Sequence, residues 1–152
     1  MTLKPGKPRS IEFAAKGFHL VSYASTGNKS ATLTLEKGTD PSQNRTYLLL
    51  HTKLVGNLEK DLNKAAGEGY RLVPHTFAFL GGFFAIAEKP VVPATVRYQY
   101  RVHQTMRVSS AEKNIAEDQA KGFVLIDSWQ FLNQSHLIVL EKQLEMPPDQ
   151  RT

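Results

Sequence analysis

The apolar positions between residues 47 and 88 predict a strand, a helix and a two-stranded ribbon in succession. Residues 47–53 form a short run of aromatic, aliphatic and polar side chains that is typical of a strand. In the next stretch apolar side chains recur at helical spacing, at Leu58, Leu62, Ala65 and Ala66. Residues 70–79 and 82–88 are again strand-like, and Leu80-Gly81 between them predicts a tight turn. Together these segments indicate a β-α-β-β unit.

The same unit occurs three times along the chain. Gly17, Gly69 and Gly122 are each followed by an aromatic residue, then any residue, then leucine. Nineteen residues beyond each glycine stands a Glu-Lys pair: Glu36-Lys37, Glu88-Lys89 and Glu141-Lys142. The second and third units also align upstream without gaps, for example at Tyr47 and Tyr100. A shared period of this kind predicts a tandem array. We place the units at residues 10–37, 47–89 and 96–142 of one domain, 1–152.

Capping signals predict where the helices begin and end. Ser109 and Glu112 have the spacing of a capping box in the third unit. Asn57 is the expected cap of the helix in the second unit. Gly69 and Gly122 stand just past the last helical turn, where a left-handed residue commonly ends a helix.

The first unit differs from the others at its start. Its helix would be the short stretch 10–16, and its turn falls at residues 26–29. Residues 1–9 contain two prolines, so they do not predict a leading strand. Either the natural chain extends upstream of Met1, or another segment fills that edge of the sheet. We favour the first explanation, which also leaves room for a removed signal peptide.

The predicted fold is α+β, with tandem β-α-β-β repeats that form a largely antiparallel sheet or a curved half-barrel. We expect about eight strands, with three helices on one face. One face of the last strand is apolar in all three units and should pack on the helices. The opposite face carries Thr32 and Thr34 in the first unit, but in the others it is apolar, at Phe84, Ile86, Leu137 and Val139.

Strands that are apolar on both faces are covered on both faces. The second face of the two later units is therefore expected to line a barrel interior, meet another sheet or form a subunit interface. We predict a homodimer or a strongly curved sheet. The candidate interface residues are Phe84, Ile86, Leu137 and Val139.

Composition is that of a globular domain. The chain has 152 residues, of which 41% are hydrophobic and 22% charged. It has no cysteine, which excludes disulfides and thiolate metal sites. No apolar run reaches the roughly 18 residues of a transmembrane helix, so we expect no membrane span. We expect a soluble protein, cytoplasmic as written, with export left open if the N-terminus is trimmed.

The units resemble a known family at the segment after the helix. The second unit reads Glu68-Gly69-Tyr70-Arg71-Leu72-Val73, and the third carries the looser copy Lys121-Gly122-Phe123-Val124-Leu125-Ile126. Tyr98 and Tyr100 form a Tyr-x-Tyr strand. In these features the chain resembles a bacterial family of short β-α-β-β domains of unknown function, over most of residues 47–142 and more faintly over 10–37. The matching positions are mainly packing positions, so the resemblance implies a fold and no activity.

The sequence offers no clear catalytic chemistry. The five histidines are His19, His51, His75, His103 and His136, and no two occupy the same repeat position or the short spacing of a local metal-ligand set. We expect isolated structural or surface histidines, with no catalytic residue, no metal and no cofactor. The Glu-Lys pairs fall at strand ends, where we expect them to be solvated.

Three function hypotheses remain. The leading one is a non-catalytic binding or assembly module that forms a homo-oligomer. The second is a small-ligand binder or enzyme with a pocket at a unit boundary. Phe77 with Phe79, or Trp129 with Phe131, would form the base of an apolar pocket between sheet and helices, although such aromatics are more often core residues. The sequence names no ligand and no ligand-binding residue for it.

The third hypothesis is weak nucleic-acid binding through Arg97, Arg101, Arg107 and nearby tyrosines. The net charge of +5 permits such binding but is too small to argue for it. The RNA-binding strand motif argues against it, because Leu20 stands where that motif needs an aromatic residue to stack on a base.

Overall fold

The computed structural model of the protein describes most of the chain. The described residues are 2–3, 11–15, 18–26, 30–37, 45–79, 82–90, 96–130 and 135–145. Within them the chain forms eleven strands and two helices, so the fold is α+β as predicted. Neither of these helices has the length and apolar character needed to cross a membrane.

The strands form three antiparallel sheets. The first sheet has the order β1-β4-β3, from Thr2–Leu3, Ser30–Lys37 and Phe18–Thr26. The second has the order β2-β5-β8-β6, from Ile11–Ala15, Arg45–Thr52, Phe83–Pro90 and Arg71–Leu72, and β7 (Ala78–Phe79) also pairs with β8. The third has the order β10-β11-β9, from Val124–Gln130, His136–Glu145 and Val96–Thr105.

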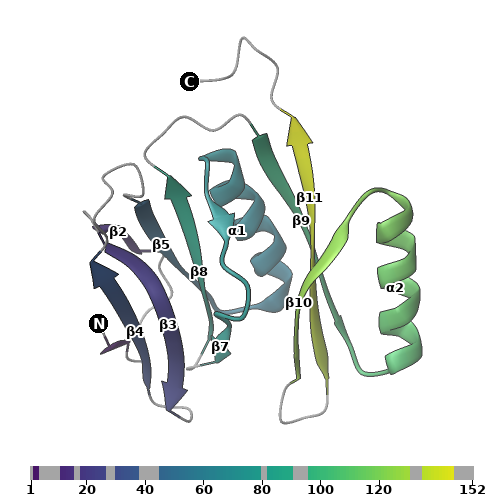
Figure 1. The fold of residues 1–152 in the computed structure, drawn as a ribbon. Coiled ribbons are helices and arrows are strands. Elements are labelled where there is room, and N and C mark those ends of the chain that lie inside the picture. The colour runs from purple at the N-terminus through teal and green to yellow at the C-terminus, as the bar shows by residue number, and fades with distance from the viewer. Residues whose placement is uncertain are drawn as a thin grey trace.

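Sheets and helices are stacked in layers. Figure 1 shows, in order across the molecule, the first sheet, the second sheet, α1 (Val55–Gly67), the third sheet and α2 (Val108–Ala120). The helix α1 lies between two sheets, and α2 covers the outer side of the third. The prediction of three helices on one face of a single sheet is therefore wrong.

The first unit is where the secondary structure departs most from the prediction. Residues 11–15, assigned from the sequence to a helix, form β2, which pairs with β5 from Ile11 opposite Leu49 to Ala15 opposite Arg45. Helix nucleation is unfavourable in so short a segment, whereas the open edge of β5 offers backbone hydrogen bonds. The predicted lack of a leading strand is also wrong, because Thr2–Leu3 pairs with β4 as β9 pairs with β11.

The three ribbons pair in the same register relative to their glycines. The residue two places after the glycine lies opposite the glutamate of the Glu-Lys pair: His19 opposite Glu36, Arg71 opposite Glu88 and Val124 opposite Glu141. The register shifts after Leu20 in the first ribbon and after Leu125 in the third, which places a bulge at equivalent positions. The tips of the predicted turns, at residues 27–29, 80–81 and 133–134, lie outside the described residues.

Both helices end as predicted. Gly69 and Gly122 have positive φ values of 95° and 93°. After α1, the Tyr70 N–H donates to the Ala65 carbonyl and the Gly69 N–H to the Ala66 carbonyl, which is the Schellman arrangement. The same pair of bonds closes α2. Gly17, the third glycine of the pattern, lies outside the described residues.

The helix starts differ from the prediction. α1 begins at Val55 after Leu54, and α2 begins at Val108 after Arg107. Neither of the residues before the helix caps it through a side chain. Asn57 and Ser109, the predicted caps, lie inside the first helical turn, so the two capping predictions are wrong.

α1 supplies the centre of the hydrophobic core. Its apolar stripe is buried as the spacing predicts, at Leu58, Leu62, Ala65 and Ala66. The partners come from both neighbouring sheets: Leu48, Leu50, Ala85 and Ala87 from the second, and Tyr100, Leu137 and Val139 from the third. Burying one such leucine is worth about 1.5–3 kcal/mol, so this helix holds the two sheets together.

The four candidate interface residues are buried within a single chain. Phe84, Ile86, Leu137 and Val139 are all at most 3% exposed. Leu137 and Val139 pack in the core around α1, and Phe84 stacks on the ring of His51. They therefore present no surface to a second subunit. The second face of the third sheet is covered by α1 and the second sheet of the same chain.

The described residues of the outermost layers are mostly polar, although Val108 of α2 is exposed. Thr32, Thr34 and Glu36 on β4 are exposed. In α2 only Asp118 is buried, although this helix packs its partly buried Ala111 and Ile115 against a small apolar cluster. α2 has a sheet on one side only, so it needs a narrower apolar stripe than α1.

Side chains of α1 close the open edge of β9. Asn63 accepts a hydrogen bond from the Tyr100 N–H at 2.8 Å and donates one to the Tyr100 carbonyl at 3.0 Å. Glu59 accepts a bond from the Val102 N–H at 2.9 Å. These two side chains pair with the edge as a neighbouring strand would. An unpaired, buried backbone group costs about 1–3 kcal/mol, so the helix is fixed in position along β9.

We expect Asn63→Ala to lower the free energy of unfolding by about 2–4 kcal/mol, because it leaves both backbone groups of Tyr100 without their partners. The matched control is Asn57→Ala, an exposed asparagine on the same helix. Denaturant titration of the two variants measures the difference. Equal stabilities would show that the edge of β9 does not depend on Asn63.

Candidate functional site

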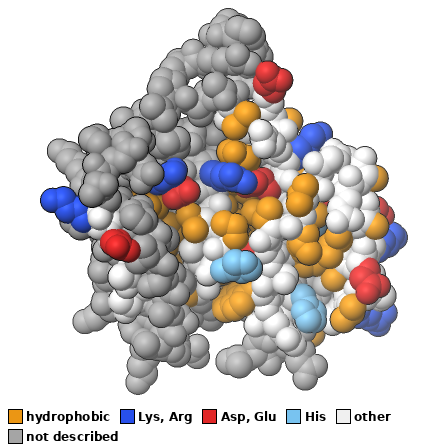
Figure 2. Space-filling view, in the orientation of Figure 1, with side chains coloured by type: hydrophobic (Ala, Val, Ile, Leu, Met, Phe, Trp, Pro, Cys, Tyr) orange, Lys and Arg blue, Asp and Glu red, His pale blue; other side chains and the backbone are white. Residues whose placement is uncertain are grey.

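The segment from Arg71 to Thr76 crosses the boundary between the second and third sheets. It starts in β6 at the edge of the second sheet, and its side chains and backbone bond to residues of β9, β10 and β11. Figure 2 shows charged, hydrophobic and histidine side chains gathered across the middle of this face. We call this boundary the seam.

Three side chains form a hydrogen-bonded network at one end of the seam, in which Tyr100 and Glu141 are buried and Arg71 is exposed. Arg71 donates two hydrogen bonds to the Glu141 carboxylate, at 3.0 and 3.3 Å. The Tyr100 hydroxyl donates to the same carboxylate at 2.8 Å and accepts the Leu72 N–H at 2.8 Å. The guanidinium also lies 4.5 Å from the centre of the Tyr98 ring. The network satisfies a backbone donor at the edge of β6 and links the two sheets.

Burial and this network shift two titrations. Burial raises the pKa of the Tyr100 hydroxyl well above its ordinary value, and the nearby Glu141 carboxylate raises it further, against the opposing effect of the Leu72 N–H. The hydrogen bond to Glu141 raises the pKa of Arg71. Tyr100 therefore stays a neutral donor, and Arg71 stays charged, throughout the physiological range.

The Glu-Lys pairs are only in part the solvated residues that we predicted. Glu36 and Lys37 are exposed, but the side chain of Glu141 is only 8% exposed. Lys89 lies 4.6 Å from the centre of the Tyr70 ring, and Lys142 lies 5.8 Å from that of Phe123. In each case the lysine covers the aromatic residue after the glycine.

This covering explains the fixed spacing from glycine to pair. A Cβ on Gly69 would lie 3.1 Å from the Lys89 side chain, and one on Gly122 would lie 3.3 Å from that of Lys142. A larger residue would therefore push the lysine off the aromatic ring.

His75 stands at the other end of the seam. The His75 N–H donates to Asp127 Oδ2 at 2.8 Å, and its Nδ1 lies 3.3 Å from Asp127 Oδ1. The Asp127 side chain is 3% exposed, whereas that of His75 is 82% exposed. His75 also has a φ of 65°, the one positive value among described residues other than glycine. The buried Asp127 carboxylate thus holds His75, which has a left-handed backbone and an exposed imidazole.

The loop that carries His75 is fixed on both sides. The Val73 N–H donates to the Ile86 carbonyl at 2.8 Å. The Thr76 hydroxyl donates to the Val73 carbonyl at 2.7 Å and accepts from the Ile86 N–H at 3.0 Å. His75 is therefore presented on a rigid loop.

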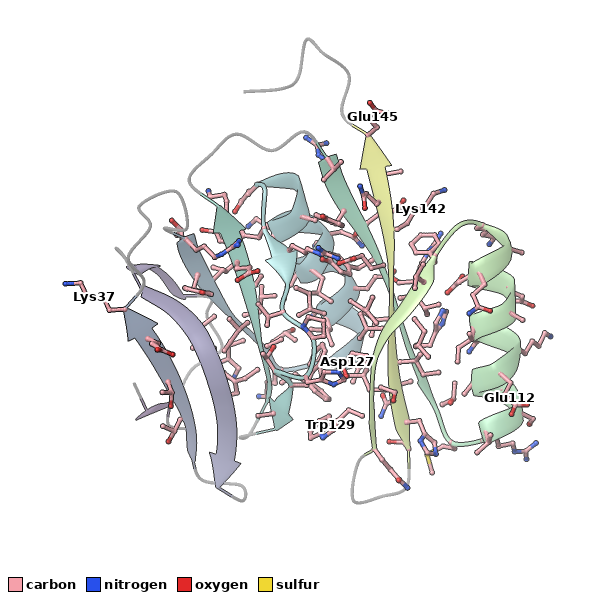
Figure 3. The ribbon with its side chains drawn as sticks, in the orientation of Figure 1. Lys37, Glu112, Asp127, Trp129, Lys142 and Glu145 are labelled. Carbon is pink, nitrogen blue, oxygen red and sulfur yellow. The ribbon has the colours of Figure 1, made fainter. Side chains whose placement is uncertain are left out.

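Trp129 lies two residues after Asp127 on β10. Figure 3 shows Asp127 and Trp129 on β10, on the side toward α1. Trp129 is half-buried and meets the Phe83 ring edge to face at 6.4 Å. Of the other predicted pocket aromatics, Phe77 is in the core, and the side chains of Phe79 and Phe131 lie outside the described residues.

The remaining histidines have separate roles. His51 is buried against Phe84, and His103 bonds through Nε2 to Asp118 of α2. His136 is half-buried in β11, and the side chain of His19 lies outside the described residues. Within the described part of the chain, no three histidine or carboxylate side chains come together as a metal site would require.

The arginines of the nucleic-acid hypothesis are not gathered as we predicted. Arg97 and Arg101 lie on β9, but Arg107 precedes α2 beyond the far end of that strand. Tyr98 and Tyr100 point to the opposite side of β9, into or against the core around α1. The three arginines and the tyrosines therefore do not share one surface, and nucleic-acid binding stays a prediction.

A small cavity of about 130 Å³ opens between α1 and β5. Its apolar lining comes from Leu48, Leu50 and Ala65, and its charged lining from Asp61, Lys64 and Glu68. It lies inside the second unit and not at a unit boundary. Pockets for drug-sized ligands are usually about 300–1,000 Å³, so this cavity admits only a small fragment.

We expect Tyr100→Phe to lower the free energy of unfolding at neutral pH by about 1–3 kcal/mol, through loss of its two hydrogen bonds. The folded protein holds the Tyr100 proton more tightly than the unfolded chain does, so stability falls as pH rises above about 10. The variant should show a shallower alkaline decline. Denaturant titrations across this pH range test both effects, with Tyr98→Phe as the control; equal alkaline slopes for wild type and Tyr100→Phe would contradict the assignment.

Comparison of the chain with family models, with curated proteins and with solved structures found no match. The resemblance to short β-α-β-β domains therefore stays a prediction from the residues themselves.

Proposed function

We propose that the chain is a non-catalytic binding module and that its ligand binds at the seam, beside the loop from Val73 to Thr76. The observation that supports this proposal is the conformation of His75. A left-handed backbone costs a residue other than glycine about 1–2 kcal/mol. The loop nevertheless carries a histidine there, with its side chain 82% exposed.

Packing does not account for the imidazole, because so little of it is buried. The backbone bond to Asp127 does not need it either, because any residue with an N–H at this position makes that bond. Strained residues held by rigid surroundings are characteristic of binding sites. The ring is therefore best explained as a group that meets a ligand, with Trp129 as an adjacent aromatic surface.

The same geometry favours binding over catalysis. Catalytic groups act best in sites that exclude water, and His75 is open to solvent. Asp127, the partner of His75, holds the loop in place through a hydrogen bond. Arg71, Glu141 and Tyr100 bond to one another and join the two sheets.

We also infer that the three units are tandem copies of one ancestral unit. The shared register of the three ribbons supports this, as do the equivalent bulges of the first and third. So does the shared strand order, with the first strand beside the last in β1-β4, β5-β8 and β9-β11. In the first unit β2 stands in place of the helix.

Fragment titration followed by amide NMR shifts and Trp129 fluorescence tests the binding proposal. Trp129 is the only tryptophan in the chain. The probes are aromatic carboxylic acids, aliphatic amines and neutral amides. We expect one class to shift the amides from Arg71 to Thr76 together with those around Asp127.

His75→Gly should remove this response while changing the free energy of unfolding by less than about 1 kcal/mol, because glycine relieves the strain. His75→Asn, which tolerates the left-handed backbone, should behave similarly, and His136→Asn is the control. Unchanged fragment binding in His75→Gly would contradict the proposal. Shifts confined to Leu48, Asp61 and Glu68 would move the ligand to the cavity beside α1.

The predicted homo-oligomer has lost its structural basis, so we propose that the chain is a monomer. The four residues on which the oligomer rested are buried within one chain. Multi-angle light scattering at micromolar concentration should give a mass near 17.0 kDa. A stable dimer would show that a different surface joins the subunits.

A further inference from the structure

The third sheet extends beyond the helix that covers it. β9 and β11 each have ten residues, and α2 has thirteen. At about 3.3 Å per strand residue and about 1.5 Å per helical residue, the strands are about 33 Å long and the helix about 20 Å. Figure 1 shows β9 and β11 continuing past the end of α2. The start of β9 and the end of β11 thus form a shelf on the side toward α2.

Side-chain alternation decides which residues this shelf carries. His103 and Leu140 contact α2 or its small apolar cluster, so residues at even spacings from them face the same side. From β9 these are Arg97, Gln99 and Arg101, and from β11 they are Lys142 and Leu144. Figure 3 labels Lys142 on this part of β11.

Three cations lie in a row on the shelf. Lys142 is directly opposite Gln99, between Arg97 and Arg101. Successive cations are therefore offset by about 6.6 Å along the strands, which makes the row about 13 Å long. A linear row of this kind matches a ligand with repeated charges better than it matches a single small anion.

Two buried carboxylates of the third unit bond to other groups and not to this row. Glu141 faces the other side of β11 and bonds to Arg71 and Tyr100. Asp118, the buried carboxylate of α2, bonds to His103. Among the described residues, no ion pair involves any of the three cations.

The two inner cations are held over one ring. Arg101 lies 5.6 Å and Lys142 5.8 Å from the centre of Phe123. Arg101 Nε is buried and has no hydrogen-bond partner. Two like charges on one aromatic ring repel each other, and an anion bound between them would remove that repulsion. Arginine and lysine are also the side chains that bind phosphate most often.

We propose that this shelf binds the phosphate backbone of a single-stranded nucleic acid through Arg97, Arg101 and Lys142. The binding is independent of the seam, because it uses the opposite side of the third sheet and none of the groups around His75. It depends on the backbone and not on base sequence, because the shelf offers charge and few groups that could read a base. Three phosphate contacts make it weak and sensitive to salt.

Fluorescence anisotropy of a labelled oligo-deoxythymidine tests the proposal. With three contacts on a single strand, log K should fall with log salt at a slope of about 2, which is about a twenty-fold loss between about 50 and 200 mM salt. The triple variant Arg97→Gln, Arg101→Gln, Lys142→Gln should lose most of the affinity. A variant with Arg101→Lys and Lys142→Arg, which keeps every charge, should retain binding.

The matched control is the triple variant Arg107→Gln, Lys113→Gln, Lys60→Gln, which makes the same change in net charge at exposed positions away from the shelf. It should bind within about two-fold of wild type, and circular dichroism should show all variants folded.

Equal losses of affinity in both triple variants would mean a general charge effect and would overturn the proposed site. No anisotropy change for wild type at low salt would overturn the proposal, as would binding to phosphatidylglycerol vesicles without binding to the oligonucleotide. His75→Gly should leave oligonucleotide binding unchanged, so this proposal and that for the seam fail separately.

Discussion

The open edge of the first strand in each later unit is the constraint on which the rest of the structure depends. β5 and β9 each pair with the last strand of their own unit on one side, which leaves the other edge without a partner. The preceding unit closes it in both cases. β2 pairs with β5 through its backbone, and α1 pairs with β9 through Asn63 and Glu59. Because buried backbone groups must be bonded, these closures set the order of the layers.

The layer order in turn decides which side chains are buried. α1 has a sheet on each side and buries four apolar residues, whereas α2 has one sheet and its only buried residue is Asp118. The layer order also decides which polar groups have partners within the protein. Arg71, Glu141 and Tyr100 satisfy one another where two sheets meet. His75, Arg97 and Lys142 lie where a layer ends, and these are the groups that we propose to bind ligands.

The candidate sites could be predicted only in small part. The histidine and the arginines are visible in the sequence, but no local spacing joins His75 to Asp127, which lies 52 residues away. The best available signal was the constancy of the Glu-Lys spacing, which in the second and third units reflects the contact of the lysine with the aromatic residue after the glycine. The sequence pattern grouped Arg101 with Arg107, whereas strand register groups it with Lys142.

By itself the sequence determined most of the local structure of the second and third units, including the apolar stripe of α1 and the glycines that end both helices. The strand predicted over residues 70–79 is an exception, because residues 73–77 form a loop between β6 and β7. The features that the sequence determined depend on interactions within a few residues, which periodicity and backbone freedom reveal. Tertiary structure alone decided that residues 11–15 form a strand, that Leu137 and Val139 face α1, and that the sheets are separate layers. The reason is that each of these outcomes depends on which unpaired edge or uncovered face lies nearby, and that is a property of the assembled fold.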